Sequence, residues 1–297
     1  MSDRPLLGCG TALVTPFDAS GDVDEEALKS LIDWQIEEGV DFLVPCGSTG
    51  EAATLSHDEH LRIVEITAER ADGRLPVVAG SGSNDTEKCI RLSREVLERG
   101  ATHLLVVSPM YNKPPQRGIV EHFRKVADAV DAPVLLYNVP GRTASNMSAA
   151  TTLELAAHPR IIGTKEASGD LDQIGEVLLG RPKGFSVLSG DDAVTLPLMA
   201  LGADGVISVV SNAVPRQMSD LVRAMASGDL ERARSIQTAL HELMAAAFVE
   251  SNPIPVKAAL AELGRASDRV RLPLVPLADE HRAAIRSALA RAEAVTS

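Results

Sequence analysis

The sequence predicts a (β/α)8 TIM barrel with a C-terminal helical domain, and three observations carry this prediction. Eight short apolar runs recur along residues 1–228. Amphipathic helical patterns fill the gaps between these runs. After Gly228 the strand patterns stop, and only helical patterns continue. Because eight alternating strand and helix units are typical of this fold, we expect a barrel over 1–228 and an appended helical domain over 229–297.

The expected strands lack a clean polar alternation, as parallel strands do when helices cover both of their faces. An open, doubly wound sheet is the alternative. No complete G-x-G-x-x-G motif follows the first strand, and Gly80-Ser-Gly82 lacks the third glycine, so the barrel is favoured. The eight expected strands are Ala12–Val14, Phe42–Val44, Val77–Ala79, Leu104–Val107, Val134–Leu136, Ile161–Ile162, Val187–Leu188 and Val206–Val210.

Capping and stop residues mark the expected helices. The first helix, Asp24–Glu38, stops at Gly39. The second opens with Ser56 and Glu59, which form the S-x-x-E capping-box pattern. Further helical patterns cover Thr86–Arg99, Gly118–Val130, Ser148–Ala157, Leu171–Leu179, Asp192–Leu201, Pro215–Ala226, Asp229–Leu263 with an interruption at 252–255, and Leu277–Val295. The last two patterns would pack either on the barrel or on a sister subunit.

Composition and charge exclude several classes of protein. The chain is 45% hydrophobic and 24% charged, as in a globular protein, and no apolar window approaches the length of a membrane span. A net charge of −12 argues against nucleic acid as a partner. The first residues lack a secretory pattern, so we expect a cytoplasmic protein. The three isolated cysteines, Cys9, Cys46 and Cys89, support neither a disulfide framework nor a zinc site, and we expect no metal.

The side chains that follow barrel strands share one rim, where barrel enzymes keep their chemistry. Lys165 closes the apolar run that begins at Ile161. A lysine at a buried strand end is costly unless it is used, and its neutral amine can attack a ketone to form a Schiff base. Taken alone, the segment favours a lysine that extends into solvent or pairs with a carboxylate, and the rest of the chain reverses this preference.

Other residues on the same rim complement such a lysine. The turn Gly47-Ser-Thr-Gly50 offers hydroxyls and backbone amides to a small anion, although a bare glycine turn is the commoner explanation. Tyr137 could pack as an ordinary aromatic residue, or it could move protons near a Schiff base. Arg142, after a Pro-Gly turn, could bind a carboxylate or form a loop salt bridge. Cys46 is interpreted as a small buried residue rather than a nucleophile.

Five blocks of the sequence, in this order, resemble the dihydrodipicolinate synthase family of pyruvate-dependent class I aldolases. The similarity runs nearly end to end, from Gly10-Thr-Ala-Leu-Val-Thr-Pro-Phe17 to Leu272-Pro-Leu274. The blocks are Gly47-Ser-Thr-Gly-Glu51, Tyr137-Asn-Val-Pro-Gly-Arg-Thr143, Gly163-Thr-Lys-Glu166, Leu188-Ser-Gly-Asp-Asp192 and Asn252-Pro-Ile-Pro-Val-Lys257.

This resemblance implies a catalytic set. Lys165 would form an imine with pyruvate, so that no metal or organic cofactor is needed. Tyr137 would be the proton donor and acceptor, and Ser48 and Tyr111 would complete its relay. In the family the tyrosine that matches Tyr111 comes from a neighbouring subunit. The resemblance therefore implies a homo-oligomer, typically a tetramer built as a dimer of dimers.

The same resemblance implies substrate contacts. Thr49 would hold the pyruvate carboxylate, and Gly190 and Ile207 would contact pyruvate through their backbone. Arg142 would bind the carboxylate of aspartate semialdehyde. The implied reaction condenses these two small molecules into the heterocycle of lysine and diaminopimelate biosynthesis.

Two alternatives stay open at this point. The first is another aldolase of the same barrel, cleaving N-acetylneuraminate or a 2-keto-3-deoxy sugar acid. Ser48 does not distinguish it, because many synthases have threonine there and the sialic-acid lyases share the serine. Arg142 and the block at 252–257 favour the synthase, since a polyhydroxy substrate needs neutral donors. The second is a non-catalytic relative that binds a keto acid, although such a chain would be expected to have lost part of the catalytic set.

Feedback control by lysine is expected to be weak. His57, His60 and Asn84 match the allosteric lysine site of the family, but Lys88 replaces a glutamate and Met110 replaces a tyrosine. A lysine in place of the carboxylate would repel the effector's ammonium group. His57 and His60 have no evident third ligand, so we expect them on a capped, exposed helix turn rather than at a metal.

Overall fold

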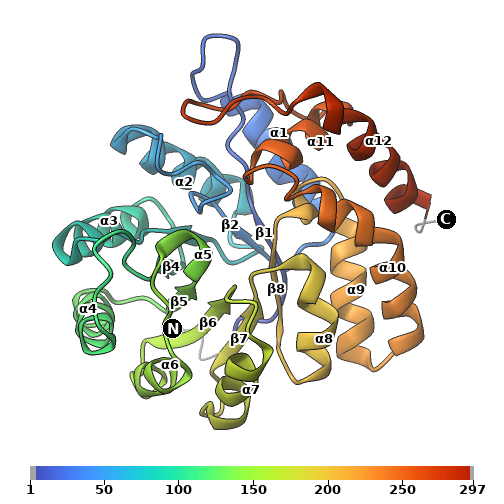
Figure 1. Ribbon diagram of the computed structural model, residues 1–297. Coiled ribbons are helices and arrows are strands. Elements are labelled where there is room, and N and C mark those ends of the chain that lie inside the picture. Colours follow the sequence, from blue (N-terminus) through green and yellow to red (C-terminus); the bar gives the residue numbers. More distant parts are fainter. Residues whose placement is uncertain (1–4, 295–297) are drawn as a thin grey trace.

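The computed structural model describes residues 5–294, and these form a (β/α)8 barrel, as the sequence predicts (Figure 1). Its parallel strands follow the order β2-β1-β8-β7-β6-β5-β4-β3. The ring closes between β2 and β3, because Leu43 N donates to Pro76 O at 3.0 Å and Gly80 N donates to Pro45 O at 3.0 Å. The strands are β1 (Gly8–Ala12), β2 (Phe42–Val44), β3 (Val78–Gly80), β4 (His103–Val107), β5 (Val134–Asn138), β6 (Ile161–Glu166), β7 (Ser186–Ser189) and β8 (Gly205–Ser208).

The helices surround the strands, and the first two begin at the expected residues. Asp24 caps the first helix by accepting from Ala27 N, and Ser56 and Glu59 form the expected capping box. The helices are α1 (Glu25–Glu37), α2 (His57–Ala71), α3 (Thr86–Glu98), α4 (Gln116–Ala129), α5 (Pro140–Thr143), α6 (Ala149–Ala156), α7 (Leu171–Gly180), α8 (Thr195–Ala200), α9 (Pro215–Ser227), α10 (Leu230–Ala246), α11 (Ile254–Glu262) and α12 (Asp279–Glu293), with 3-10 turns η1 (Asp192–Val194) and η2 (Val210–Asn212).

The first strand lies earlier than its expected position, Ala12–Val14. Strand β1 runs over Gly8–Ala12, and its two glycines leave it without the continuous apolar run that marks the other strands. Gly10 is required by packing, because a Cβ there would lie 1.9 Å from the Phe42 ring. The strand is therefore set by the close approach of its neighbour rather than by local propensity.

Strand β6 extends beyond the expected Ile161–Ile162 to Glu166, so Lys165 is inside the strand rather than at its end. The pairing with β5 shifts after Val134, which pairs with Ile161, while Leu135 pairs with Gly163. Ile162 is thus an extra residue in β6, and the strand contains a β-bulge. Gly163 is needed directly after it, because a Cβ would lie 2.5 Å from Ser186 O in β7.

The helices after Gly228 pack on the barrel of the same chain, beside α9 (Figure 1). One buried apolar cluster joins Cys9 of β1 and Val206 of β8 with Val222 of α9, Leu240 of α10 and Leu289 of α12. The break between α10 and α11 covers 247–253, so it overlaps the interruption expected at 252–255, but Ile254 and Pro255 already belong to α11. Within residues 5–294, no helix combines the length and the apolar character that crossing a membrane requires.

Candidate active site

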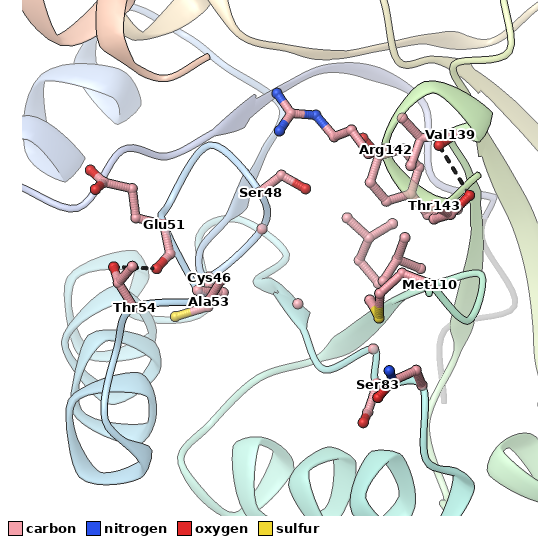
Figure 2. A pocket seen from close by; sticks show the side chains of 18 of the residues that line it. Cys46, Ser48, Glu51, Ala53, Thr54, Ser83, Met110, Val139, Arg142 and Thr143 are labelled. Carbon is pink, nitrogen blue, oxygen red and sulfur yellow. Dashed lines mark hydrogen bonds between the residues drawn. The ribbon is translucent and has the colours of Figure 1, made fainter. Parts of the chain in front are cut away.

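A cavity of about 600 Å³ opens at the carboxyl ends of the barrel strands. Residues that follow β2, β3, β4 and β5 line it together with residues of the segment between α10 and α11. Figure 2 shows Arg142 reaching from α5 across the cavity above Ser48, while the Met110 side chain lies on another wall. The part of the expected rim that follows β2 to β5 therefore encloses one space, whereas Lys165, Gly190 and Ile207 are not among the residues that line it.

Lys165 and Tyr137 lie side by side inside the barrel. The two residues are register partners of β6 and β5, so their side chains point to the same face of the sheet. Lys165 Nζ lies 4.4 Å from the centroid of the Tyr137 ring. Both side chains are buried, and Tyr137 lines the cavity. The most important pair expected from the sequence is thus brought together by the barrel.

Gly190, directly after β7, lies against the lysine side chain, and Ile207 belongs to β8. A Cβ on Gly190 would lie 3.0 Å from Lys165 Cε, so the backbone passes directly against the lysine side chain. Gly190 N already donates to Glu166 O at 2.7 Å. Ile207 belongs to the apolar cluster that fills the barrel and includes Tyr137. Gly190 is thus placed beside Lys165, and Ile207 is placed in the interior of the barrel.

The loop that follows β2 carries Ser48 and Thr49. Ser48 lines the cavity and is exposed, whereas Thr49 is buried. Thr49 Oγ1 accepts a hydrogen bond from Asn252 Nδ2 at 2.8 Å. The amides of Gly50 and Glu51 donate to carbonyls inside the turn, at 3.1 and 3.2 Å. The turn itself thus uses the Gly50 amide, which is one of those that the sequence suggested for anion binding.

Arg142 lines the cavity and is exposed to solvent. It belongs to the short helix α5, which the sequence did not predict and which Pro140 begins. Its Nη2 donates to Asn252 O at 3.3 Å. Asn252 therefore contacts both residues that are expected to bind carboxylates, and its Oδ1 is buried without a hydrogen-bond partner within the described residues. Asn252 was part of a recognised block, but the sequence gave no indication of this bridging position.

Tyr111 lies outside the cavity lining of its own chain. Its side chain is 88% exposed, and its backbone has a φ of 71°, a left-handed conformation that is rare for a tyrosine. The neighbouring Met110 does line the cavity. The single chain thus brings Ser48, Tyr137 and Arg142 to one space with Lys165 beside them, but it does not bring Tyr111 there.

The surroundings of the histidines and of Cys46 near the cavity indicate structural rather than catalytic roles. His57 is exposed as expected, but His60 is buried, and its Nε2 lies 2.9 Å from Gly80 O. Burial lowers the pKa of His60 and raises the pKa of the Cys46 thiol. A thiol held in its neutral form is a poor nucleophile, which fits the packing role expected for Cys46. Among the residues described, no group of three or more His, Cys, Asp or Glu side chains has an arrangement that could hold a metal ion.

Fold and site together define a (β/α)8-barrel enzyme with a buried lysine beside a tyrosine. The chain belongs to the dihydrodipicolinate synthetase family, whose model matches residues 5–292. It is 51% identical over 288 residues to the 4-hydroxy-tetrahydrodipicolinate synthase of Koribacter versatilis (strain Ellin345), covering 97% of this chain and 96% of that protein.

Solved structures agree with this assignment. Dihydrodipicolinate synthase from Aquifex aeolicus superposes with a TM-score of 0.94 at 44% identity, over 97% of this chain and 98% of that one. The chloride-inhibited dihydrodipicolinate synthase from Acinetobacter baumannii, complexed with pyruvate, gives a TM-score of 0.95 at 41% identity, over 97% and 99%.

Proposed function

We propose that this chain condenses pyruvate with L-aspartate 4-semialdehyde, the activity of a 4-hydroxy-tetrahydrodipicolinate synthase. The observation that carries the proposal is the buried Lys165 amine held 4.4 Å from the Tyr137 ring centroid at the cavity. Two relatives that carry this name are 51% and 50% identical to the chain over nearly their whole length.

In this mechanism the Lys165 amine attacks the keto carbon of pyruvate and forms a carbinolamine, which loses water to give the imine. The pyruvate methyl group then loses a proton to give an enamine. The enamine carbon attacks the aldehyde of the second substrate, and the amino group of that substrate displaces Lys165 as the ring closes. The imine on Lys165 supplies the chemistry that a cofactor supplies in other enzymes. We therefore propose that the reaction uses neither a metal nor an organic cofactor.

Tyr137 would move protons between the amine, the carbinolamine and solvent, with Ser48 as the next hydroxyl of the relay. Thr49 would hold the pyruvate carboxylate, and Gly190 and Ile207 would contact pyruvate through their backbone. The buried position of Thr49 and the close approach of Gly190 to Lys165 support these roles.

Arg142 would bind the carboxylate of the semialdehyde, which favours this substrate over a sugar acid. Its exposed guanidinium at the cavity wall supports the role. Replacing Arg142 by Ala should reduce turnover of the semialdehyde far more than formation of the pyruvate imine. Equal loss in both steps would argue for a polyhydroxy substrate or a structural role.

We further propose a homo-oligomer, a tetramer built from dimers, in which Tyr111 completes the relay of a neighbouring subunit. The exposure of Tyr111 outside its own cavity supports this arrangement. The expected substrates are small metabolites, and a cytoplasmic location is part of the same proposal.

Borohydride trapping tests the central proposal. The protein is incubated with pyruvate and sodium borohydride, with and without the semialdehyde, and the modified peptide is identified by mass. We expect a reduced pyruvate adduct on Lys165 and, with both substrates, a heterocyclic product. An adduct without that product would favour the sugar-acid aldolase, and no adduct would support the non-catalytic alternative. The Lys165→Ala variant is the control.

A further inference from the structure

Asn138 and Glu166 form a hydrogen-bonded pair on the outer face of β5 and β6. Asn138 Nδ2 lies 3.1 Å from Oε1 and 3.3 Å from Oε2 of Glu166. The two residues are 0% and 1% exposed. They are register partners one position beyond Tyr137 and Lys165, so their side chains point away from the cavity. The pair is therefore a buried contact directly behind the reacting residues.

The bulge at Ile162 makes the register of these two strands critical. Before the bulge, Val134 pairs with Ile161, and after it Tyr137 pairs with Lys165. A slip of one residue would turn Lys165 to the outer face of the barrel, because strand side chains alternate with a period of two. The pairing before the bulge therefore does not by itself determine the pairing at the site.

Both members of the pair are held from several directions. Glu166 Oε1 accepts from Ser168 N at 2.8 Å, and Asn138 Oδ1 accepts from Met147 N at 3.0 Å. Glu166 O accepts from Gly190 N at 2.7 Å, so the same residue also fixes the backbone that passes Lys165. Burial raises the pKa of Glu166, and the hydrogen bonds that its carboxylate accepts from Ser168 and Asn138 oppose the rise.

We propose that Asn138 and Glu166 are positioning residues for the reaction, because their hydrogen bond sets the register in which Lys165 faces Tyr137. Neither side chain points into the cavity, so both act through the strands. The inference rests on the proposed function, since it assumes that Lys165 forms the imine.

The test replaces the hydrogen bond by a repulsion. In Asn138→Asp a carboxylate faces the Glu166 carboxylate at nearly unchanged volume. We expect the rate of imine trapping with pyruvate to fall about tenfold to a hundredfold, as small misplacements of reacting groups do. The KM for the semialdehyde should stay within about twofold, because Arg142 is held by other contacts. Adding Glu166→Gln lets the glutamine amide donate to the new carboxylate while its carbonyl oxygen accepts from Ser168 N, and this double variant should recover at least about tenfold of the lost rate.

A matched control is Thr67→Val, which removes a buried 2.7 Å hydrogen bond to Ile63 O inside α2, away from the cavity lining. This variant should trap at the wild-type rate, and thermal unfolding is measured for every variant. Wild-type trapping by folded Asn138→Asp, or a folded double variant no faster than it, would overturn the inference. If Asn138→Asp does not fold, the double variant decides: trapping within about tenfold of the wild type supports the inference, and slower trapping overturns it. Failure of the wild type to trap at Lys165 would instead remove the proposed function.

Discussion

Lys257 and Glu51 form a buried ion pair that ties helix α11 to the end of the loop carrying Ser48 and Thr49. Lys257 Nζ lies 2.5 Å from Glu51 Oε1, and their side chains are 0% and 1% exposed. Lys257 Nζ also donates to Arg269 O at 2.6 Å, and it lies 4.1 Å from the Phe17 ring centroid. Burial lowers the pKa of Lys257 to about 8, against the opposing effect of Glu51.

Breaking this pair should be costly. Lys257→Met leaves the Glu51 carboxylate buried without its counter-ion, which typically destabilises a protein by about 3–5 kcal/mol. Urea unfolding at pH 7 measures the loss. The double variant Glu51→Gln, Lys257→Met removes both charges and should recover most of it. A loss below about 1 kcal/mol in the single variant would show that the pair contributes little.

The Glu59–Arg271 pair should make stability depend on acid pH. Arg271 donates to both carboxylate oxygens of Glu59, at 2.9 and 2.5 Å, and these bonds hold the pKa of Glu59 at about 2 rather than 4.5. The contribution is complete above pH 4.5 and is lost as the pH falls toward 2.

Glu59→Gln isolates this charge, because glutamine can still complete the capping box with Ser56. We expect it to lower stability by about 2 kcal/mol at pH 7, and the difference from the wild type should shrink as the pH falls below 4.5. Thermal unfolding midpoints across this pH range measure the effect. A difference that does not change with pH would exclude the ionic contribution.

Adding a methyl group at Gly190 should damage the site. Its Cβ would lie 2.7 Å from Ala167 Cβ and 3.0 Å from Lys165 Cε. We expect Gly190→Ala to lower kcat/KM at least about tenfold, with a stability loss of about 1–3 kcal/mol from overpacking. Gly175→Ala, in helix α7 with no atom within 4 Å of the new Cβ, is the control and should keep full activity. Equal activity of the two variants would contradict the close packing at Lys165.

Hybrid oligomers can show whether Tyr111 acts on a neighbouring subunit. Tyr111→Phe and Lys165→Ala each damage every site of a homo-oligomer. Co-refolded hybrids would contain sites that combine an intact Lys165 with an intact Tyr111 of the other chain. We expect activity well above either parent, measured by product formation after mixing. No gain in proven hybrids would mean that Tyr111 does not act across subunits.

Lysine should inhibit the enzyme weakly. Asn84 and Met110 line the same cavity as the proposed active site, and the exposed Lys88 lies on the first turn of α3. A cation there disfavours a ligand that carries an ammonium group. Activity should therefore persist at millimolar lysine, and Lys88→Glu should increase inhibition. Half-inhibition of the wild type at sub-millimolar lysine would refute this prediction.

The sequence was most informative where structure depends on local chemistry. Capping residues such as Asp24 and Ser56 located helix starts, and apolar runs located most strands. The position of Lys165 near the carboxyl end of its strand followed from the predicted barrel, although Lys165 lies inside β6 rather than after it. The boundary of β1 was missed because Gly10 is set by the Phe42 ring of the adjacent strand, a contact that no local pattern records.

Long-range polar contacts could not be predicted. Lys257 and Glu51 are 206 residues apart, and either one alone resembles an ordinary surface charge. The Asn252 contacts to Thr49 and Arg142 likewise depend on how the segment before α11 returns over the barrel mouth. The bulge at Ile162 determines which face Lys165 occupies, and a one-residue shift in pairing has no signature in composition or periodicity.

The apolar cluster shared by β1, β8 and helices α9, α10 and α12 has a consequence for recombining this chain with its relatives. A crossover placed at Gly228 would exchange Leu240 and Leu289 while keeping Cys9, Val206 and Val222 from the other parent. Chimeras divided there would inherit mismatched halves of one core. Viable hybrids should instead exchange the first strand and the last helices together, as one block that is contiguous in space although it is split in the gene.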